Sequence, residues 1–172
     1  MTPEYQASGA ETRLAEPRSG LAEVPAGKVG AGEAAMDDIE AIRQLKARYC
    51  RLLDTKDWDG FRELFTDKAV MDTTSSGGNA LTGGDAIVDF VRRALTEAVT
   101  VHHCHTPEIT ATAPDMATGI WAMEDRVRFP DGTDLTGYGH YHETYTKTDS
   151  TWQISSLTLT RLRVDFARPD SA

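Results

Sequence analysis

The chain has 172 residues, a length that fits one domain of ordinary size with or without a tail. Acidic residues outnumber basic ones by 27 to 18, and the net charge of −9 argues against general binding to nucleic-acid backbones or anionic lipid. No apolar run approaches the ~18 residues of a membrane-spanning helix. The two cysteines, Cys50 and Cys104, are too few for a disulfide framework, so we expect a cytoplasmic protein.

Residues 1–35 differ in composition from the rest of the chain. They are rich in Ala, Gly, Pro and Glu, and Tyr5 is their only aromatic residue. A segment with so few apolar side chains cannot offset the entropy that it would lose on ordering. We therefore expect a disordered tail over residues 1–35 and one folded domain over residues 36–168.

Three helices are predicted in the first half of this domain. The first begins at Asp37 or Asp38, and its apolar stripe consists of Ile39, Ile42, Leu45, Tyr49 and Leu52. Asp57 is expected to cap a second helix, and Asp85 a third. Between these two helices the sequence predicts a short strand over residues 69–72 and a Gly/Ser/Thr loop over residues 73–84.

After residue 98 the apolar period changes from 3.6 to 2 residues, which predicts strands. The expected strands cover residues 101–112, 117–129, 135–148 and 152–166, and the first is broken or bulged near Pro107. Helices followed by a run of strands indicate an α+β fold, in which a curved antiparallel sheet packs on three N-terminal helices. The hollow between sheet and helices would suit a small molecule.

Polar residues interrupt the predicted apolar faces at two places. Asp125 lies in the middle of the apolar face of strand 117–129, where a carboxylate needs a partner or a proton. In His102-His103-Cys104-His105, strand alternation turns at least one imidazole inward. A buried histidine beside a carboxylate is a competent general base, while a salt bridge or a backbone hydrogen bond is the purely structural alternative.

A metal site is a weaker hypothesis from the same histidines. The pairs His103/His105 and His140/His142 each place two imidazoles on one strand face, but no acid follows either pair at a familiar spacing. The sequence also contains no P-loop, GxGxxG, GxSxG or paired CxxC motif. Phosphoryl transfer, dinucleotide binding and serine hydrolysis therefore lack their usual sequence support.

Three further residues have more than one reading. Tyr49 is a core residue or a donor to an oxyanion in the pocket. Arg161 is a partner of Asp125, a ligand for an anionic substrate, or a side chain that extends to solvent. Asp54 lies ~140° around the first helix from Tyr49 and near the helix end, so it either bends into the pocket or marks the turn.

Several segments resemble the SnoaL-like branch of the nuclear-transport-factor-2-like superfamily. These segments are residues 38–49, 53–58, 105–109 and 117–126. The similarity covers roughly residues 36–166, and some segments look particularly like the bile-acid and scytalone dehydratases. The motifs are specific for the superfamily and its dehydratase-like branch but carry little information on the substrate, because this fold hosts many functions. The resemblance implies a cone-shaped α+β fold with a deep apolar pocket, usually in an oligomer.

The resemblance also implies roles for individual residues. Tyr49 matches a pocket tyrosine, Asp54 an acid at the end of the first helix, His102 the catalytic histidine, Asp125 its partner acid, and Arg161 a pocket arginine. An alignment on scytalone dehydratase makes His103 the base instead. The residues expected to contact the substrate are Trp58, His103, Trp121, Met123 and His140.

Residues and resemblance together predict a cofactor-independent, dehydratase-type lyase. The substrate would be an apolar cyclic hydroxy-carbonyl compound, steroid-like or polyketide-like, with a coenzyme A ester as one option. His102 would remove a proton while Asp125 orients the imidazole ring. The alternatives are an isomerase, a polyketide cyclase, or a non-catalytic ligand-binding or oxygenase-partner subunit, the last favoured if Asp125 pairs only with Arg161. We expect no metal, no nucleic acid and no membrane, and a homodimer or homotrimer.

Overall fold

The structure of the protein, a computed structural model, describes residues 31–168, with side chains from residue 36 onward. The elements in chain order are α1 (Ala31–Asp54), α2 (Trp58–Glu63), β1 (Phe65–Asp72), the 3-10 helix η1 (Thr74–Ser76), β2 (Ala80–Thr82), α3 (Gly84–Leu95), β3 (Val99–Ala113), β4 (Met116–Arg128), β5 (Asp134–Thr148) and β6 (Thr151–Ala167). The predicted tail of residues 1–35 lies outside the described residues, except for the backbone of residues 31–35, which belongs to α1.

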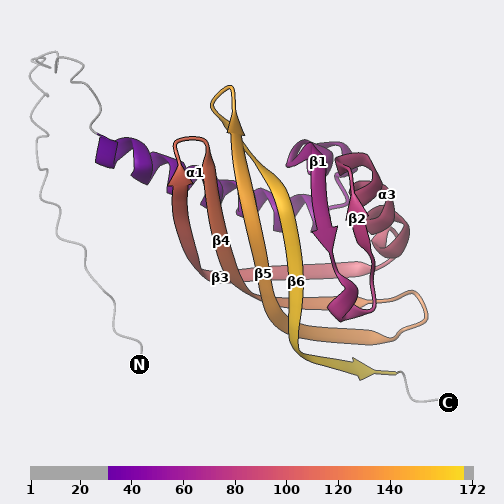
Figure 1. Cartoon of the computed structure of the whole chain (residues 1–172). Coiled ribbons are helices and arrows are strands. Elements are labelled where there is room, and N and C mark those ends of the chain that lie inside the picture. The colour runs from indigo at the N-terminus through magenta and orange to yellow at the C-terminus, as the bar shows by residue number, and fades with distance from the viewer. Residues whose placement is uncertain (1–30, 169–172) are drawn as a thin grey trace, which may run out of the picture.

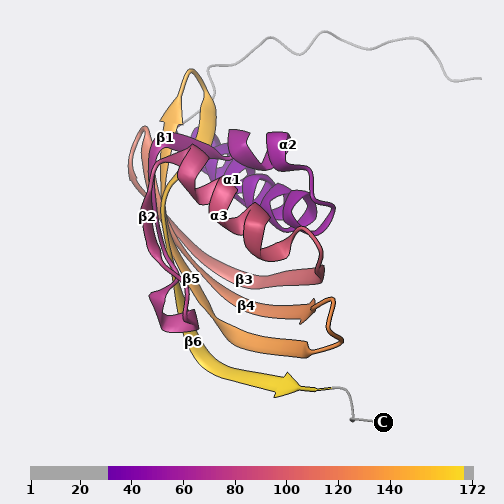
Figure 2. The same ribbon diagram turned by 90° about the vertical axis from the view of Figure 1, so that its right-hand side faces the viewer.

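The strands form one sheet in the order β2-β1-β6-β5-β4-β3. Strands β3 to β6 are joined as successive antiparallel hairpins, while β1 adds to β6 in the parallel direction. The sheet bends strongly along its length, and the three helices lie on its concave side (Figures 1 and 2). This arrangement confirms the predicted α+β fold and shows that one strand pairing departs from the antiparallel pattern.

Helix α1 packs on the concave face because its apolar residues share one stripe. Ile42, Leu45, Tyr49, Leu52 and Leu53 are each no more than 6% exposed. Burying these side chains provides most of the stability of such a helix.

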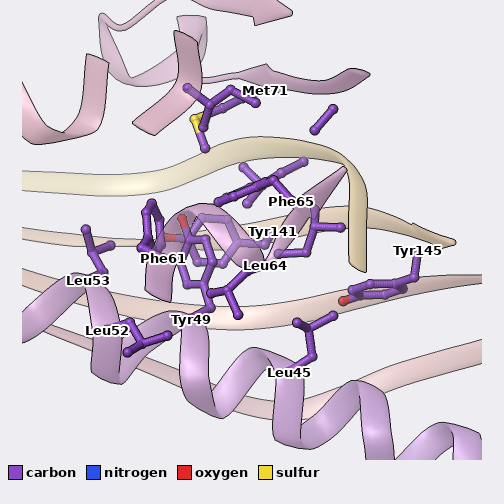
Figure 3. Packing of buried hydrophobic residues seen from close by; sticks show 14 of the residues in the cluster. Leu45, Tyr49, Leu52, Leu53, Phe61, Leu64, Phe65, Met71, Tyr141 and Tyr145 are labelled. Atoms are coloured by element: carbon purple, nitrogen blue, oxygen red, sulfur yellow. The ribbon is translucent and has the colours of Figure 1, made fainter. Parts of the chain in front are cut away.

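Aromatic side chains from several elements meet at the centre of the core (Figure 3). The rings of Tyr49 and Phe61 lie 5.1 Å apart, and those of Phe61 and Phe65 lie 5.2 Å apart. These tilted and edge-on arrangements are the ones that aromatic pairs prefer. The cluster joins α1, α2 and the start of β1, and so fixes the end of α1 against the sheet.

Several boundaries in the first half differ from the prediction. Helix α1 begins at Ala31, earlier than the predicted start, and the expected loop over residues 73–84 contains η1 and the short strand β2. Asp57 caps α2 as predicted, by accepting a hydrogen bond from the Gly60 N–H at 3.0 Å. Asp85 does not cap α3: Gly83 occupies the cap position, and Asp85 instead accepts a 2.6 Å hydrogen bond from Arg62.

The strands of the second half agree with the prediction to within one or two residues at each end. The pairing of β3 with β4 shifts between His105 and Glu108, which confirms the bulge predicted near Pro107.

Cys50 on α1 and Cys104 on β3 are free thiols whose Sγ atoms lie 3.7 Å apart. None of the helices within residues 31–168 combines the length and the apolar character needed to cross a bilayer.

Asp38 ties α1 to the hairpin between β5 and β6. Its Oδ1 atom accepts hydrogen bonds from Lys147 Nζ at 2.6 Å and from Trp152 Nε1 at 2.9 Å. The hydrogen bond from Lys147, followed by that from Trp152, holds the pKa of the Asp38 carboxyl below its usual value. The carboxylate is therefore bound more strongly in the folded protein than in the unfolded chain.

We predict that Asp38 makes the free energy of unfolding depend on pH. Because its pKa is lower in the folded state, its contribution is complete above about pH 4 and is lost as the pH falls through the folded-state pKa. Urea unfolding at a series of pH values should show that Asp38→Asn is destabilising at neutral pH, and that the deficit shrinks in acid. The exposed neighbour Asp37 provides the control, since Asp37→Asn removes the same charge. Equal, pH-independent effects of both changes would contradict the prediction.

Candidate active site

A cavity of about 250 Å³ lies between the concave face of the sheet, helices α1 and α3, and the loop that contains η1. Its apolar wall includes Leu53, Met71, Phe90, Val91, Val127, Leu135, Leu157 and Leu159. Seven residues with polar or charged side chains interrupt this wall: Tyr49, Thr73, Ser76, His102, Asp125, Tyr141 and Arg161. A mostly apolar hollow with a few converging polar groups is the usual form of a small-molecule site.

His102 is paired with Asp54 through both its ring and its backbone. The ring Nδ1 lies 2.7 Å from Asp54 Oδ1, and the His102 N–H donates to Asp54 Oδ2 at 2.8 Å. Strand β3 is at the edge of the sheet, and there the Asp54 carboxylate provides an acceptor for this N–H group. Asp54, the last residue of α1, is therefore the acid that orients the imidazole ring.

Thr100 and Lys56 extend this arrangement behind the imidazole. The Thr100 hydroxyl donates to Asp54 Oδ1 at 2.9 Å, and Lys56 Nζ donates to the Thr100 oxygen at 2.8 Å. Burial raises the pKa of Asp54, but the hydrogen bonds from the side chain and backbone of His102, together with that from Thr100, outweigh burial and bring the pKa below its ordinary value. Asp54 is thus ionised and accepts the proton on Nδ1, so a neutral His102 carries its lone pair on Nε2.

Asp125 pairs with Arg161, and this corrects the predicted contact between Asp125 and His102. Arg161 Nη1 and Nη2 donate to the two carboxylate oxygens of Asp125 at 2.9 and 2.7 Å, in a bidentate geometry. Arg161 Nε donates to Ser76 Oγ at 2.7 Å, which connects the ion pair to η1. His102 and Asp125 are opposite each other on β3 and β4, yet no hydrogen bond joins their side chains among the residues that the structure describes.

Gly137 leaves the space that the Asp125–Arg161 pair occupies. It lies opposite Asp125 in the register of β4 and β5. A Cβ atom built on Gly137 would overlap the Asp125 carboxylate and the Arg161 guanidinium group. A residue without a side chain is therefore needed at this point of the concave face.

Tyr49 and Tyr141 are hydrogen-bond donors in the cavity wall. Both are almost fully buried, and their ring centroids lie 5.8 Å apart. Burial raises the pKa of each phenol well above its ordinary value. Both side chains therefore keep their protons at physiological pH and can donate to an oxygen atom of a bound molecule.

None of the five residues predicted to contact the substrate is among the lining residues of this cavity. His103 and His140 point to the outer face, because strand alternation turns their neighbours His102 and Tyr141 inward. Trp121 and Met123 are on the inner face of β4 but farther along it, and Trp58 packs on Phe61 with ring centroids 6.4 Å apart.

Among residues 31–168, no three His, Cys, Asp or Glu side chains converge as a metal site would require.

Thr100, Tyr141 and Gly137 belong to the site but were missed by sequence reasoning. Thr100 has a detectable signal, since it lies two residues before His102 on the same face of β3. Tyr141 was missed because His140 was expected to contact the substrate, which assigns Tyr141 to the opposite face, whereas the structure turns Tyr141 inward. Gly137 has no such signal, because its role follows from the register of β5 against β4.

We predict that Gly137→Ala forces Asp125 and Arg161 apart. Overpacking of this kind costs roughly 1–3 kcal/mol, which urea unfolding at neutral pH should detect. Thr136→Ala is the control, because Thr136 is the preceding residue of β5 and its side chain faces the other side of the sheet. If both variants have the stability of the parent protein, the ion pair does not depend on the glycine.

Comparison with known proteins places this chain in a family. A model of the SnoaL-like domain matches residues 34–158 of the chain. The probable cyclase FGR4 of Gibberella zeae is 31% identical over 133 residues, which cover 70% of this chain and 89% of that protein.

Solved structures with the same fold include enzymes of two kinds. One is a protein of Novosphingobium aromaticivorans provisionally assigned as a scytalone dehydratase, with 20% identity, a TM-score of 0.73, and coverage of 82% of this chain and 95% of that one. Another is the hexachlorocyclohexane dehydrochlorinase LinA-type3 from Novosphingobium barchaimii, with 15% identity, a TM-score of 0.70, and coverage of 83% and 97%. At these identities the likeness concerns the fold alone. Because the domain model matches most of its length, the chain belongs to the SnoaL-like family.

Proposed function

We propose that the protein is a cofactor-independent acid–base enzyme of the lyase, isomerase or cyclase type. The observation that carries this proposal is the His102–Asp54 pair in the wall of an apolar cavity. A histidine whose ring is fixed by a carboxylate is suited to removing a proton from carbon. The chemistry of the other cavity groups agrees with this role.

In the proposed reaction His102 Nε2 takes a proton from a carbon next to a carbonyl group. Asp54 holds the ring in the tautomer that leaves Nε2 free and stabilises the imidazolium that forms. The electron pair of the broken C–H bond moves toward the carbonyl oxygen. Tyr49 and Tyr141 would then donate hydrogen bonds to the enolate oxygen, which is where negative charge develops.

Dehydration is the first outcome that we propose for this enolate. A hydroxyl group on the next carbon departs as the electron pair returns from the enolate, and the proton on His102 converts the departing hydroxide into water. The solved structure assigned as a scytalone dehydratase shares the fold that this outcome would use. The C–O bond breaks and a conjugated C=C bond forms, so no outside reagent is consumed.

Cyclisation is the second candidate outcome, and the similarity to a probable cyclase favours it. Here the same enolate carbon attacks a second carbonyl of the substrate, and the His102 proton is delivered to the new alkoxide. Both outcomes begin with one proton transfer. A measurement of that transfer therefore tests them together.

The dimensions of the cavity support a compact substrate. Its volume of about 250 Å³ is below the ~300–1,000 Å³ that is usual for ligand sites. We propose a neutral, polyketide-like or steroid-like ring compound that carries a hydroxyl and a carbonyl group. A coenzyme A ester would have to leave its nucleotide outside the cavity.

A non-catalytic binding subunit is the competing function, and the Asp125–Arg161 pair favours it. The sequence-based expectation was that a binding module would pair Asp125 with Arg161 alone, and these two side chains are joined in this way. Asp54, however, supplies His102 with the carboxylate that Asp125 does not. The acid–base function is therefore our first choice, and the proton-transfer experiment separates the two.

We also propose that the protein works as a cytoplasmic homo-oligomer, a dimer or trimer. Val99 and Val101 expose their side chains on the edge strand β3, and Leu162 and Phe166 do so on β6. Exposed apolar side chains on strands are suited to contacts between subunits. Light scattering coupled to size-exclusion chromatography measures the assembly directly.

We predict that His102→Gln and Asp54→Asn each lower the rate of proton abstraction by ~10²–10⁴-fold, the usual contribution of a positioned general base. The assay follows deuterium uptake from D₂O next to the carbonyl of cyclic hydroxy-ketones, with mass spectrometry for loss of water or ring closure. His103→Gln is the matched control, since His103 is the next residue of β3 and is exposed on the outer face.

Two results of the deuterium-uptake assay would contradict the proposal. Wild-type protein that binds these ketones with no deuterium uptake above the buffer rate would identify a binding subunit. Equal activity of folded His102→Gln and His103→Gln proteins would remove His102 from the role of base.

A further inference from the structure

A buried ion pair lies directly behind the tyrosines of the cavity. Lys46 of α1 and Glu143 of β5 are joined by an ion pair, and their side chains are 1% and 0% exposed. The proposed reaction uses neither residue. Burying two charges costs more than burying apolar side chains of similar size, so stability alone does not account for this pair in the core.

The ammonium group of Lys46 is wedged between two aromatic rings. Its Nζ atom lies 3.8 Å from the ring centroid of Tyr49 and 3.8 Å from that of Tyr141. Tyr49 is three residues after Lys46 on α1, whereas Tyr141 belongs to β5. One cation therefore fixes two rings that come from opposite sides of the cavity wall.

The rest of the network runs away from the cavity. Glu143 accepts a hydrogen bond from the Tyr145 hydroxyl, which in turn accepts one from Trp121 Nε1 at 2.7 Å. Figure 3 shows Tyr145 beside Leu45 and apart from the Tyr49–Tyr141 pair. Tyr49 and Tyr141 line the cavity, but Glu143 and Tyr145 are not among its lining residues. The Lys46 ammonium group is thus at the cavity end of the network, and the Glu143 carboxylate lies on its side away from the cavity.

We propose that Lys46 is a positioning residue, which holds Tyr49 and Tyr141 so that both phenols can donate to an oxyanion in the cavity. The inference rests on the proposed function, because it concerns the donors that would stabilise the enolate. Glu143 Oε1 keeps the ammonium group in place, while the Tyr145 hydroxyl binds only the other carboxylate oxygen, Oε2. The oxyanion is the enolate of a ring compound, for which a phenolate is a close chemical model.

The test uses 4-nitrophenol as the probe and requires no turnover. Its absorption distinguishes bound phenolate from bound phenol, so a pH series gives the preference of the cavity for the anion. The main variant is Lys46→Met combined with Glu143→Gln, which leaves no unpaired buried charge. Circular dichroism checks its fold. We expect this double variant to lose the preference for phenolate by about tenfold or more.

A second substitution separates positioning from a simple effect of charge. Tyr49→Phe should weaken the phenolate preference in the wild-type protein and have little further effect in the double variant, because Lys46 acts through the ring. If removal of the charge alone were responsible, the two effects would be independent and would add. Tyr145→Phe is the matched control: it breaks the far end of the network, should lower thermal stability, and should leave the phenolate preference unchanged.

Two results would overturn the inference. One is a folded double variant that keeps the wild-type preference for phenolate, or in which Tyr49→Phe has its full effect. The other is a wild-type protein that shows no preference for phenolate at all. Neither result depends on deuterium uptake at carbon, so a failure of Lys46 as a positioning residue remains distinguishable from a failure of His102 as a base.

Discussion

The packing of helix α1 on the concave face of the sheet is the contact on which the candidate site depends. Its apolar stripe determines which side of the helix faces the strands, and its last residue is then Asp54. That carboxylate meets the edge strand β3 at His102, where it accepts the hydrogen bond of the backbone N–H and pairs with the imidazole ring. A shift of α1 along the sheet would separate the acid from the base while leaving the core apolar.

The strand half of the fold could be predicted well because its signal is local. Alternation over a dozen or more residues specifies a strand and the face that it buries, as β4 shows with Trp121, Met123, Asp125 and Val127 all inside. The first half was harder. Strand β2 has only three residues, which is too few to show an apolar period. Aspartate is a residue type that often caps helices, but Asp85 accepts a hydrogen bond from Arg62 instead. Such choices depend on residues distant in the chain.

The sequence predicted which residues belong to the site more readily than which of them contact one another. His102, Asp54, Asp125 and Arg161 are all placed in or beside one cavity. The predicted contact between His102 and Asp125 was wrong, whereas the pairing of Arg161 with Asp125 was one of the stated alternatives. Alternation gives the face of a strand and not the distance to a helix end, so it could not choose between two acids. Lys46 was missed because a lysine is normally assigned to solvent. Its place one residue after Leu45 and three before Tyr49 was the available signal.

The pairing of Arg161 with Asp125 has a consequence for which molecules the cavity admits. The guanidinium charge is already compensated by a carboxylate that is fixed on the neighbouring wall. A substrate that brought its own permanent negative charge would compete with Asp125 for the same N–H groups and would be repelled by it. On the proposed function, this arrangement favours a neutral substrate over a free carboxylic acid, and negative charge would develop on an oxygen beside the Tyr49 and Tyr141 hydroxyls. A relative with a neutral residue in place of Asp125 would have the opposite preference.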